Sequence, residues 1–152
     1  MTEATERVVY DESTRTLRQQ FDLLDGLRSR AGTLLAAASL ATAFLSAQAH
    51  AELDALVWAA VGLFCLVIAL ALIILMPWRL TFAHDPHLLI AIHLEPGPPS
   101  SIEALYRDLS YWNGVHYQEN GRKLRAMIGL FAAACIALAV EMTLWLVVLG
   151  SQ

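Results

Sequence analysis

The sequence predicts an all-α integral membrane protein with three transmembrane helices, cytoplasmic helical extensions, a cytoplasmic N-terminus and an external C-terminus. Three observations lead to this fold class. Hydrophobic residues make up 57% of the 152 residues, whereas soluble domains contain about 45–50%, and the mean hydropathy is +0.53. The apolar residues are concentrated in three blocks that are long enough to cross a bilayer, which takes about 20 residues. The basic residues all fall on one side of the membrane if there are three spans.

The second apolar block is the strongest candidate for a span, because residues 56–76 contain no charge. Residues 126–149 are interrupted only by Glu141, and residues 31–49 are uncharged although alanine, serine and threonine dilute their leucines. Lipid offers the backbone no hydrogen-bond partners, so each span must be helical. Only residues 50–55 separate the first two spans, which therefore form a helical hairpin.

The distribution of lysine and arginine predicts the orientation, since basic residues gather on the cytoplasmic side. None lies between the first two spans and none follows the third. The ten basic residues are Arg7, Arg15, Arg18, Arg28, Arg30, Arg79, Arg107, Arg122, Lys123 and Arg125. Trp58 and Trp145 near the outer ends, and Trp78 at the inner end, fit the aromatic belts of membrane interfaces. We expect a multi-pass protein of the cell inner membrane.

Four segments follow along the chain. Residues 1–30 are predicted as a cytoplasmic N-terminal amphipathic helix, and residues 31–77 as the transmembrane hairpin. Residues 78–125 are predicted as a cytoplasmic loop and helix, and residues 126–152 as the third transmembrane helix and the C-terminus. Only isolated glycines interrupt the two cytoplasmic helices, so each is expected to continue into the span that follows it.

Each cytoplasmic helix carries an apolar stripe that has to be buried, either against the other helix or against copies in an oligomer. In the first helix the stripe consists of Leu17, Phe21, Leu24 and Ala31, at spacings of four, three and seven residues. In the second it consists of Ile102, Leu105, Leu109, Trp112 and His116. Ser100 and Glu103 form a predicted capping box at the start of the second helix.

Glu141 is the most distinctive single residue, because it is an ionisable group inside a span. It lies about fifteen residues from the inner end, which at 1.5 Å per residue is roughly 22 Å deep. The polar residues at matching depth in the first span are Thr42 and Ser46, and we expect Glu141 to face them or a water-filled interface. An intramembrane carboxyl indicates either a functional site or a hydrogen bond that only fixes helix packing.

Small residues recur every four positions in two spans, as they do where membrane helices approach closely. They are Ala37 and Ala41 in the first span and Gly129, Ala133 and Ala137 in the third.

Basic residues gather where the first and third spans leave the cytoplasm, and together they form a candidate phosphate-sensing group. They are Arg28, Arg30, Arg122, Lys123 and Arg125. Ordinary anchoring at the membrane interface is the alternative interpretation.

Other kinds of site are not indicated. The net charge of −4 argues against nucleic-acid binding. No motif of an NTPase, hydrolase or metalloprotease is present, so we expect neither an enzyme nor a cofactor. His84, Asp85, His87 and His93 contain an HxxH spacing, but no helix fixes it and no metal site is predicted.

Two stretches resemble a family of known membrane effectors. Residues 17–45 read LRQQFDLLDGLRSRAGTLLAAASLATAFL, and residues 111–141 read YWNGVHYQENGRKLRAMIGLFAAACIALAVE. In both, a polar helix with charged residues runs into an apolar span. This plan is similar to that of the SLATT proteins and the Pycsar-type transmembrane effectors of bacterial nucleotide-signalled anti-phage immunity. The resemblance implies that the chain senses a cyclic nucleotide from a partner cyclase through the basic group, then oligomerises or opens and damages the inner membrane.

The leading hypothesis is therefore an oligomeric, non-enzymatic effector that perturbs the bilayer when triggered, with the lipid bilayer and further copies of itself as partners. Two others remain open. The chain is alternatively a structural or accessory subunit of a larger membrane complex, or a small channel or transporter that uses Glu141.

Overall fold

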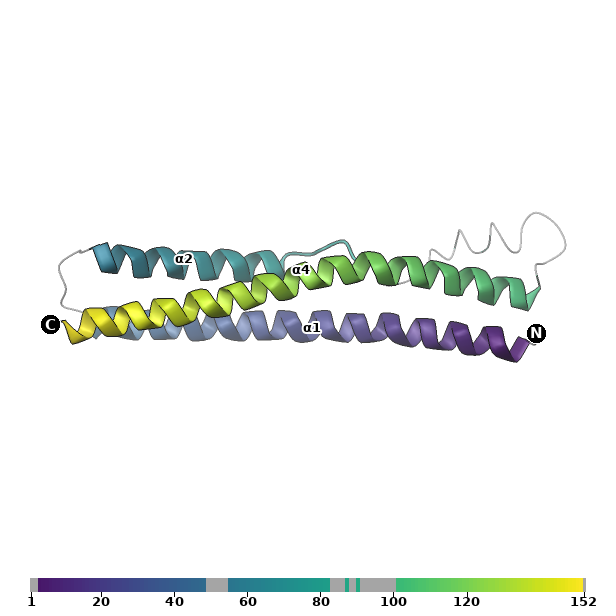
Figure 1. Cartoon of the computed structure of the whole chain (residues 1–152), viewed down its shortest axis with the longest axis horizontal. Coiled ribbons are helices and arrows are strands. Elements are labelled where there is room, and N and C mark those ends of the chain that lie inside the picture. Colours follow the sequence, from purple (N-terminus) through teal and green to yellow (C-terminus); the bar gives the residue numbers. More distant parts are fainter. Residues whose placement is uncertain (1–2, 49–54, 83–86, 88–89, 91–100, 152) are drawn as a thin grey trace. The chain divides into compact units, whose positions relative to one another are not determined.

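The computed structural model describes residues 3–48, 55–82, 87, 90 and 101–151. Three long helices account for most of them: α1 (Glu3–Gln48), α2 (Ala55–Leu75) and α4 (Ile102–Gly150) (Figure 1). The described residues include no strand. Each helix is long and apolar enough to cross a membrane. The predicted all-helical class with three apolar helices is thus confirmed.

Helices α1 and α4 are each continuous, as their sequences predicted. Helix α1 begins at Glu3, within the predicted amphipathic segment 1–30, and runs on through the first apolar block. Helix α4 passes Gly114 and Gly121 without a break. A Cβ at Gly121 would lie 3.4 Å from the side-chain nitrogen of Gln20, so this glycine permits a close approach of α1 to α4.

The chain divides into two compact units. The first, here called the polar unit, comprises Met1–Leu24 and Trp78–Leu124. The second, here called the apolar unit, comprises Asp25–Pro77 and Arg125–Gln152. Each is described by itself below.

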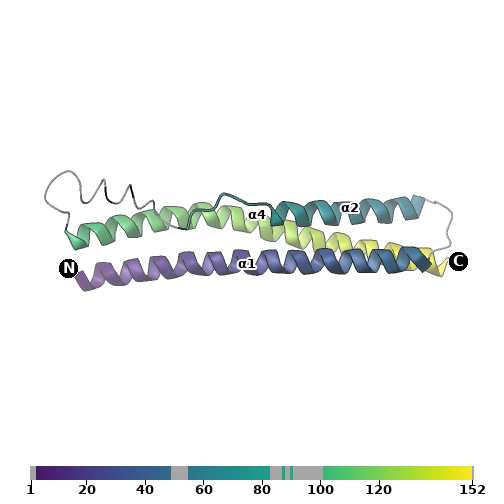
Figure 2. The same cartoon turned by 180° about the vertical axis from the view of Figure 1, so that it is seen from behind.

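In the apolar unit, α2 lies beside the C-terminal half of α1 and the C-terminal half of α4 (Figures 1 and 2). One buried residue from each helix meets at its centre: Ala38, Val67 and Ala137. Four partly buried side chains pack around them: Leu34, Leu63, Phe64 and Leu138. Two of the three central residues are alanines, which let the helix backbones approach closely.

The outward side of the apolar unit is compatible with lipid. Four of its exposed hydroxyl groups each donate a hydrogen bond to a carbonyl of their own helix. They are Thr33, Ser39 and Ser46 on α1 and Thr143 on α4. Because these groups are satisfied without water, they do not oppose insertion into a bilayer.

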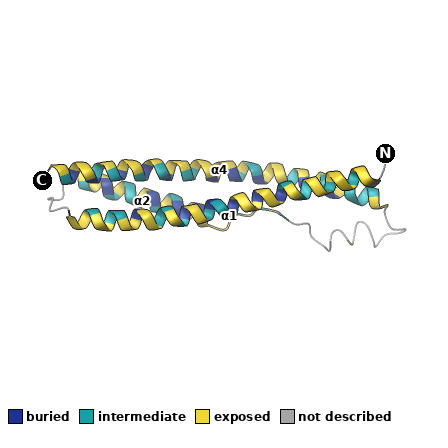
Figure 3. Cartoon of the chain, turned by 90° about the horizontal axis from the view of Figure 1, so that it is seen from below, coloured by how far each residue is buried: buried dark blue, intermediate teal, exposed yellow. Residues whose placement is uncertain are grey.

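The polar unit is built on a seam between α1 and α4 in which buried residues recur along one side of each helix (Figure 3). On α1 they are Leu17, Gln20 and Leu24, and on α4 they are Leu109, Asn113, Asn120 and Leu124. Intervals of three, four and seven residues are those of a coiled coil. Three of these seven residues are polar, a feature that the sequence analysis did not foresee.

Two of the three buried amides of the seam are hydrogen-bonded across the two helices. Gln20 Nε2 donates to the carbonyl of Tyr117 at 3.0 Å. Asn113 Nδ2 donates to the hydroxyl of Ser13 at 2.9 Å and to that of Thr14 at 3.4 Å. Such bonds make burial of an amide tolerable and fix the register of the helix pair.

The predicted stripes were only partly correct. Leu17, Leu24, Ala31 and Leu109 are buried, whereas Phe21 is 46% exposed and packs edge-to-face on Phe82. Ile102 and Trp112 are exposed, and Leu105 and His116 are half-buried. The predicted stripe on the second helix followed apolar residues alone, but the buried face passes through two asparagines.

Asn120 also holds the chain that follows α2. Its side-chain amide donates to the carbonyl of Thr81 at 2.7 Å and accepts from the amide of Thr81 at 3.2 Å. Lys123 Nζ donates to the carbonyl of Arg79 on the same segment. Residues 78–82, which are not helical, are thereby attached to α4.

Helix α4 is capped one residue later than predicted. Ser101, not Ser100, precedes the first helical residue, and its hydroxyl accepts from the amide of Ala104 at 3.3 Å. Ser100 lies outside the described residues. Hydrogen bonds from the Glu103 backbone and from Ser101 lower the pKa of the Glu103 carboxyl.

An ion pair joins the two helices near the start of α4. Arg107 donates to Glu6 Oε1 at 2.8 Å. This hydrogen bond, together with the charge of Glu6, raises the pKa of Arg107.

Replacement of Asn120 by alanine tests the attachment of residues 78–82. The change removes two hydrogen bonds and should lower the free energy of unfolding by about 1–3 kcal/mol, at about 0.5–1.5 kcal/mol for each bond. The amide of Thr81 should exchange with deuterium faster than in the wild type. Gln118→Ala, which alters an exposed side chain on the same helix, should leave that exchange unchanged.

The cap of α4 gives a pH dependence whose sign is set by Glu103. Because the Glu103 pKa is lowered in the folded protein, the ionised carboxyl stabilises the first turn at pH values above the ordinary glutamate pKa of 4.5. This stabilisation is lost as the pH falls through the lowered pKa. Ser101→Ala removes one cause and should shift the Glu103 pKa upward. A carbon-detected NMR titration of the Glu103 carboxyl measures both values, and equal pKa values in the two proteins would contradict the assigned cap.

Candidate functional site

The candidate site lies inside the apolar unit and is centred on Glu141 of α4. The side chain is completely buried, with 0% exposed. It belongs to a column of buried residues spaced seven apart along α4: Asn113, Asn120, Met127, Ala134, Glu141 and Val148. This spacing faces Glu141 toward the neighbouring helices and away from lipid.

Thr42 of α1 is the partner that the structure brings to Glu141. Its hydroxyl donates a hydrogen bond to Glu141 Oε1. Ser46, the other residue predicted at this depth, is exposed and donates to the carbonyl of Ala43 on its own helix at 3.2 Å. Of the two hydroxyls predicted at this depth, only that of Thr42 therefore contacts Glu141.

Trp145 joins the site, which the sequence analysis did not predict. We expected it in the aromatic belt with Trp58, but Trp145 is 2% exposed whereas Trp58 is 62% exposed. The reason is its position four residues after Glu141, since residues four apart share one face of a helix. That spacing is the signal that would have placed it in the bundle.

Two polar atoms of the site are buried without a hydrogen-bond partner among the described residues. They are Glu141 Oε2 and the indole nitrogen Nε1 of Trp145. One accepts hydrogen bonds and the other only donates. In this site, Glu141 Oε1 therefore has a hydrogen-bond donor. The acceptor Glu141 Oε2 and the donor Trp145 Nε1 both lack a partner among the described residues.

Apolar packing closes the site along both directions of α4. On the N-terminal side lie the central residues Ala38, Val67 and Ala137 with their surrounding side chains. On the C-terminal side Val148 is buried. The polar contact of Thr42 with Glu141 is thus enclosed in an apolar bundle.

Two of the five predicted phosphate-sensing residues contact the backbone just after α2. In the apolar unit, Arg28 Nη2 donates to the carbonyl of Met76 at 3.4 Å. In the polar unit, Lys123 donates to the carbonyl of Arg79. Cations favour carbonyls at the C-terminal end of a helix. These two side chains therefore hold the chain where it leaves α2.

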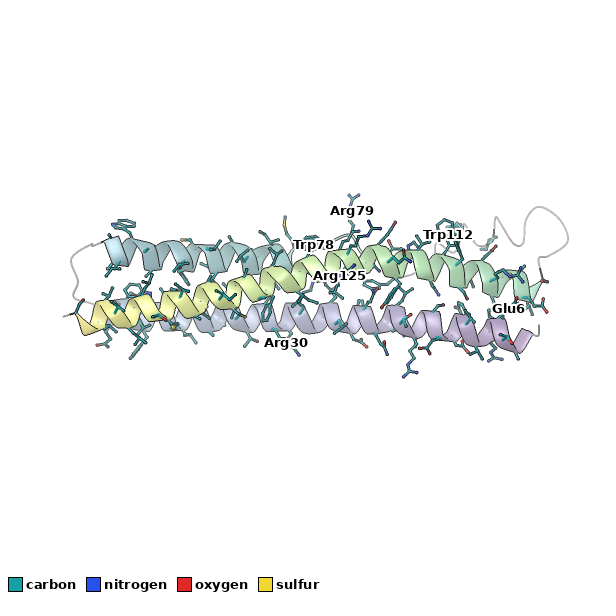
Figure 4. The ribbon with its side chains drawn as sticks, in the orientation of Figure 1. Glu6, Arg30, Trp78, Arg79, Trp112 and Arg125 are labelled. Carbon is teal, nitrogen blue, oxygen red and sulfur yellow. The ribbon has the colours of Figure 1, made fainter. Side chains whose placement is uncertain are left out.

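The other three predicted sensing residues, Arg30, Arg122 and Arg125, are exposed. Arg30 and Arg125 belong to the apolar unit, and Arg122 belongs to the polar unit. Figure 4 shows Arg30 pointing away from the neighbouring helices. Arg122 and Arg125 lie three residues apart on α4 and so share one side of that helix.

The small-residue positions are divided between the interior and the surface. Ala137 is buried and Ala41 is half-buried, whereas Ala37, Gly129 and Ala133 are exposed. A Cβ built on Gly129 would meet nothing within 4 Å.

In the part of the chain that the structure describes, no group of three or more histidine, cysteine, aspartate or glutamate side chains is arranged to hold a metal ion. Of the histidine-rich loop only His87 is described. His84, Asp85 and His93 lie outside the described residues.

Aromatic side chains are exposed on α4 of the polar unit. Tyr111 is 67% exposed and lies edge-to-face against Trp112, which also stacks near His116. Tyr117 is exposed one turn further on. Figure 4 shows Trp112 directed away from α1.

Comparison of the chain with protein-family models, with curated proteins and with solved structures found no match in any of the three.

Thr42→Val tests the central contact, since valine keeps the shape but cannot donate. We expect a loss of about 1–2 kcal/mol in the free energy of unfolding, within the range for hydrogen bonds between membrane helices and for an unsatisfied buried acceptor. Ser46→Ala is the matched control and should change stability by less than about 0.5 kcal/mol, as surface substitutions do. Both free energies are measured by reversible unfolding in mixed micelles. Equal losses in the two variants would show that the hydrogen bond from Thr42 to Glu141 does not stabilise the protein.

Proposed function

We propose that the chain is an oligomeric, non-enzymatic effector of the cell inner membrane that perturbs the bilayer when it is triggered. In this proposal the N-terminus and the polar unit lie in the cytoplasm and the C-terminus lies outside, in accord with the positions of the basic residues. The proposal also draws on the resemblance to nucleotide-signalled anti-phage effectors.

The observation that carries the proposal is the complete burial of Glu141 against Thr42 in an apolar three-helix unit. A carboxylate at the centre of a transmembrane helix costs about 2.5–3.5 kcal/mol on translocon insertion scales. A bundle that stays closed hides this group from lipid. When α1 and α4 separate, the carboxyl must be hydrated or meet another polar group, and either event brings water into the membrane.

A trigger that carries phosphate groups fits the arginines and lysine near the end of α2. Arg28 and Lys123 hold the backbone carbonyls of Met76 and Arg79. A phosphate offers each cation a charge-assisted hydrogen bond, which is about twice as strong as a neutral one. Binding of a phosphate group to either cation would thus compete with the contact that this cation makes to the backbone within its own unit.

The effector proposal predicts opposite effects for the two residues of the central contact. In proteoliposomes with an imposed potassium diffusion potential, Thr42→Val should dissipate the potential severalfold faster than the wild type without any trigger, because the closed bundle is weakened. In Glu141→Leu the leucine needs no polar partner, so this variant should dissipate the potential no faster than the wild type. Its rate should not change when a mixture of 3′,5′-cyclic mononucleotides is added. Ser46→Ala should behave as the wild type.

A Thr42→Val variant that is less stable but no leakier than the wild type would contradict the closed-bundle proposal. The nucleotide part is tested separately by native mass spectrometry in nanodiscs. A homo-oligomer that retains a cyclic nucleotide, or changes its number of copies, supports it. A monomer that is indifferent to every cyclic nucleotide opposes it.

A second candidate function is that of an accessory subunit in a larger membrane complex. The exposed aromatic side chains Tyr111, Trp112 and Tyr117 favour it, because aromatic residues are enriched at protein interfaces. Co-purification of one partner in a fixed ratio from native membranes would support this function. A stable self-oligomer without any partner would oppose it.

A further inference from the structure

The unsatisfied carboxyl oxygen of Glu141 and the unsatisfied indole N–H of Trp145 lie one helical turn apart on α4. Both atoms are buried and neither has a hydrogen-bond partner among the described residues. Four residues along a helix correspond to a rise of about 6 Å, and the β-carbons of such a pair are about 5–6 Å apart. We propose that one internal water molecule binds between these two atoms.

The chemistry of the two atoms selects water over other small occupants. The occupant must accept a hydrogen bond from the indole N–H, which only donates, and must also bond to the carboxyl oxygen. A metal ion or an ammonium ion would be repelled by the N–H group. A halide has no hydrogen to donate to the carboxyl oxygen. A water molecule accepts and donates at once, and buried waters typically make two to four hydrogen bonds to otherwise unsatisfied groups.

The surroundings exclude a lipid headgroup as the occupant. Glu141 is 0% exposed and Trp145 is 2% exposed, so neither atom can be reached from the outer surface of the apolar unit. The buried residues Ala137 and Val148 flank the pair along α4. The occupant is therefore a small enclosed molecule.

The water completes the hydrogen bonding of Glu141. Thr42 donates to Oε1, and the water bridges Oε2 to Trp145. The carboxyl is then satisfied on both oxygens, and Trp145 acts as a positioning residue for the water. This site is a property of the apolar unit and does not depend on whether the chain is an effector.

The experiment detects water at the Trp145 indole directly. The full chain, labelled with ¹⁵N in its tryptophan indoles, is placed in phospholipid bilayers, and magic-angle-spinning NMR follows magnetisation transferred from water to each indole. The Trp145 signal is assigned from its disappearance in Trp145→Phe. It should receive magnetisation from water in spite of its burial, as the exposed Trp112 does.

Variants at the second anchor of the water then test the bridge. Glu141→Leu should abolish the transfer to Trp145, and Glu141→Gln, which keeps a hydrogen-bonding group, should retain it. Thr143→Val, which alters an exposed hydroxyl bonded to its own helix, should leave it unchanged. Absence of transfer in the wild-type protein would overturn the proposal without any variant. A transfer that persists in a folded Glu141→Leu protein would also overturn it, because water would then reach the indole without the carboxyl.

Discussion

Burial of a polar group costs free energy unless the group finds a hydrogen-bond partner, and this constraint shapes both units. In the polar unit, the buried amides of Gln20, Asn113 and Asn120 bond to hydroxyls and backbone groups. In the apolar unit, the carboxyl of Glu141 bonds to Thr42. Exposed hydroxyls in the apolar unit bond to their own helices. An unpaired buried group costs about 1–3 kcal/mol, so these partners restrict how the helices can be arranged.

The buried polar residues of α4 fix how the segments packed against this helix are aligned along it. Asn113, Asn120 and Glu141 fall in one column of residues spaced by multiples of seven, among apolar members of the same column. Apolar side chains tolerate a shift along a seam, whereas an amide or carboxyl loses its partner when the helices slide. Asn113 and Glu141 therefore specify the register of α1 against α4, each within its own unit, and Asn120 fixes the position of residues 78–82 on α4.

Much of the fold followed from composition, and the missed features have a common physical cause. Long uncharged blocks define apolar helices whatever their neighbours are, so the three helices were predicted within a few residues. Thr42 was placed beside Glu141 from depth alone, because rise per residue is fixed in a helix. Rotation about the helix axis is not given by depth, and it is what distinguishes the buried Trp145 on α4 from the exposed Trp58 on α2.

The apolar stripes predicted for the two cytoplasmic helices were only partly correct because a local sequence pattern does not show which residues lie opposite. An amphipathic helix is recognised by its apolar residues, which led to Phe21, Ile102 and Trp112 as buried positions. The actual seam contains amides, and an amide is buried only when a particular partner lies opposite. That partner comes from a distant part of the chain, such as Thr81 for Asn120, and a local pattern contains no information about it.

The energies of the central contact indicate what holds the apolar unit closed. Hydrogen bonds between membrane helices contribute about 0.6 kcal/mol on average and up to about 1.7 kcal/mol. Burying an ionisable group inside a span costs several kcal/mol unless the group is paired or hydrated. Thr42 therefore offsets only part of the cost of Glu141, and the packing of Ala38, Val67 and Ala137 with their neighbours must supply the rest. Apolar packing holds the three helices together around the buried carboxyl as long as no water enters the bundle. In the effector proposed above, hydration of Glu141 would favour further separation once the helices begin to part.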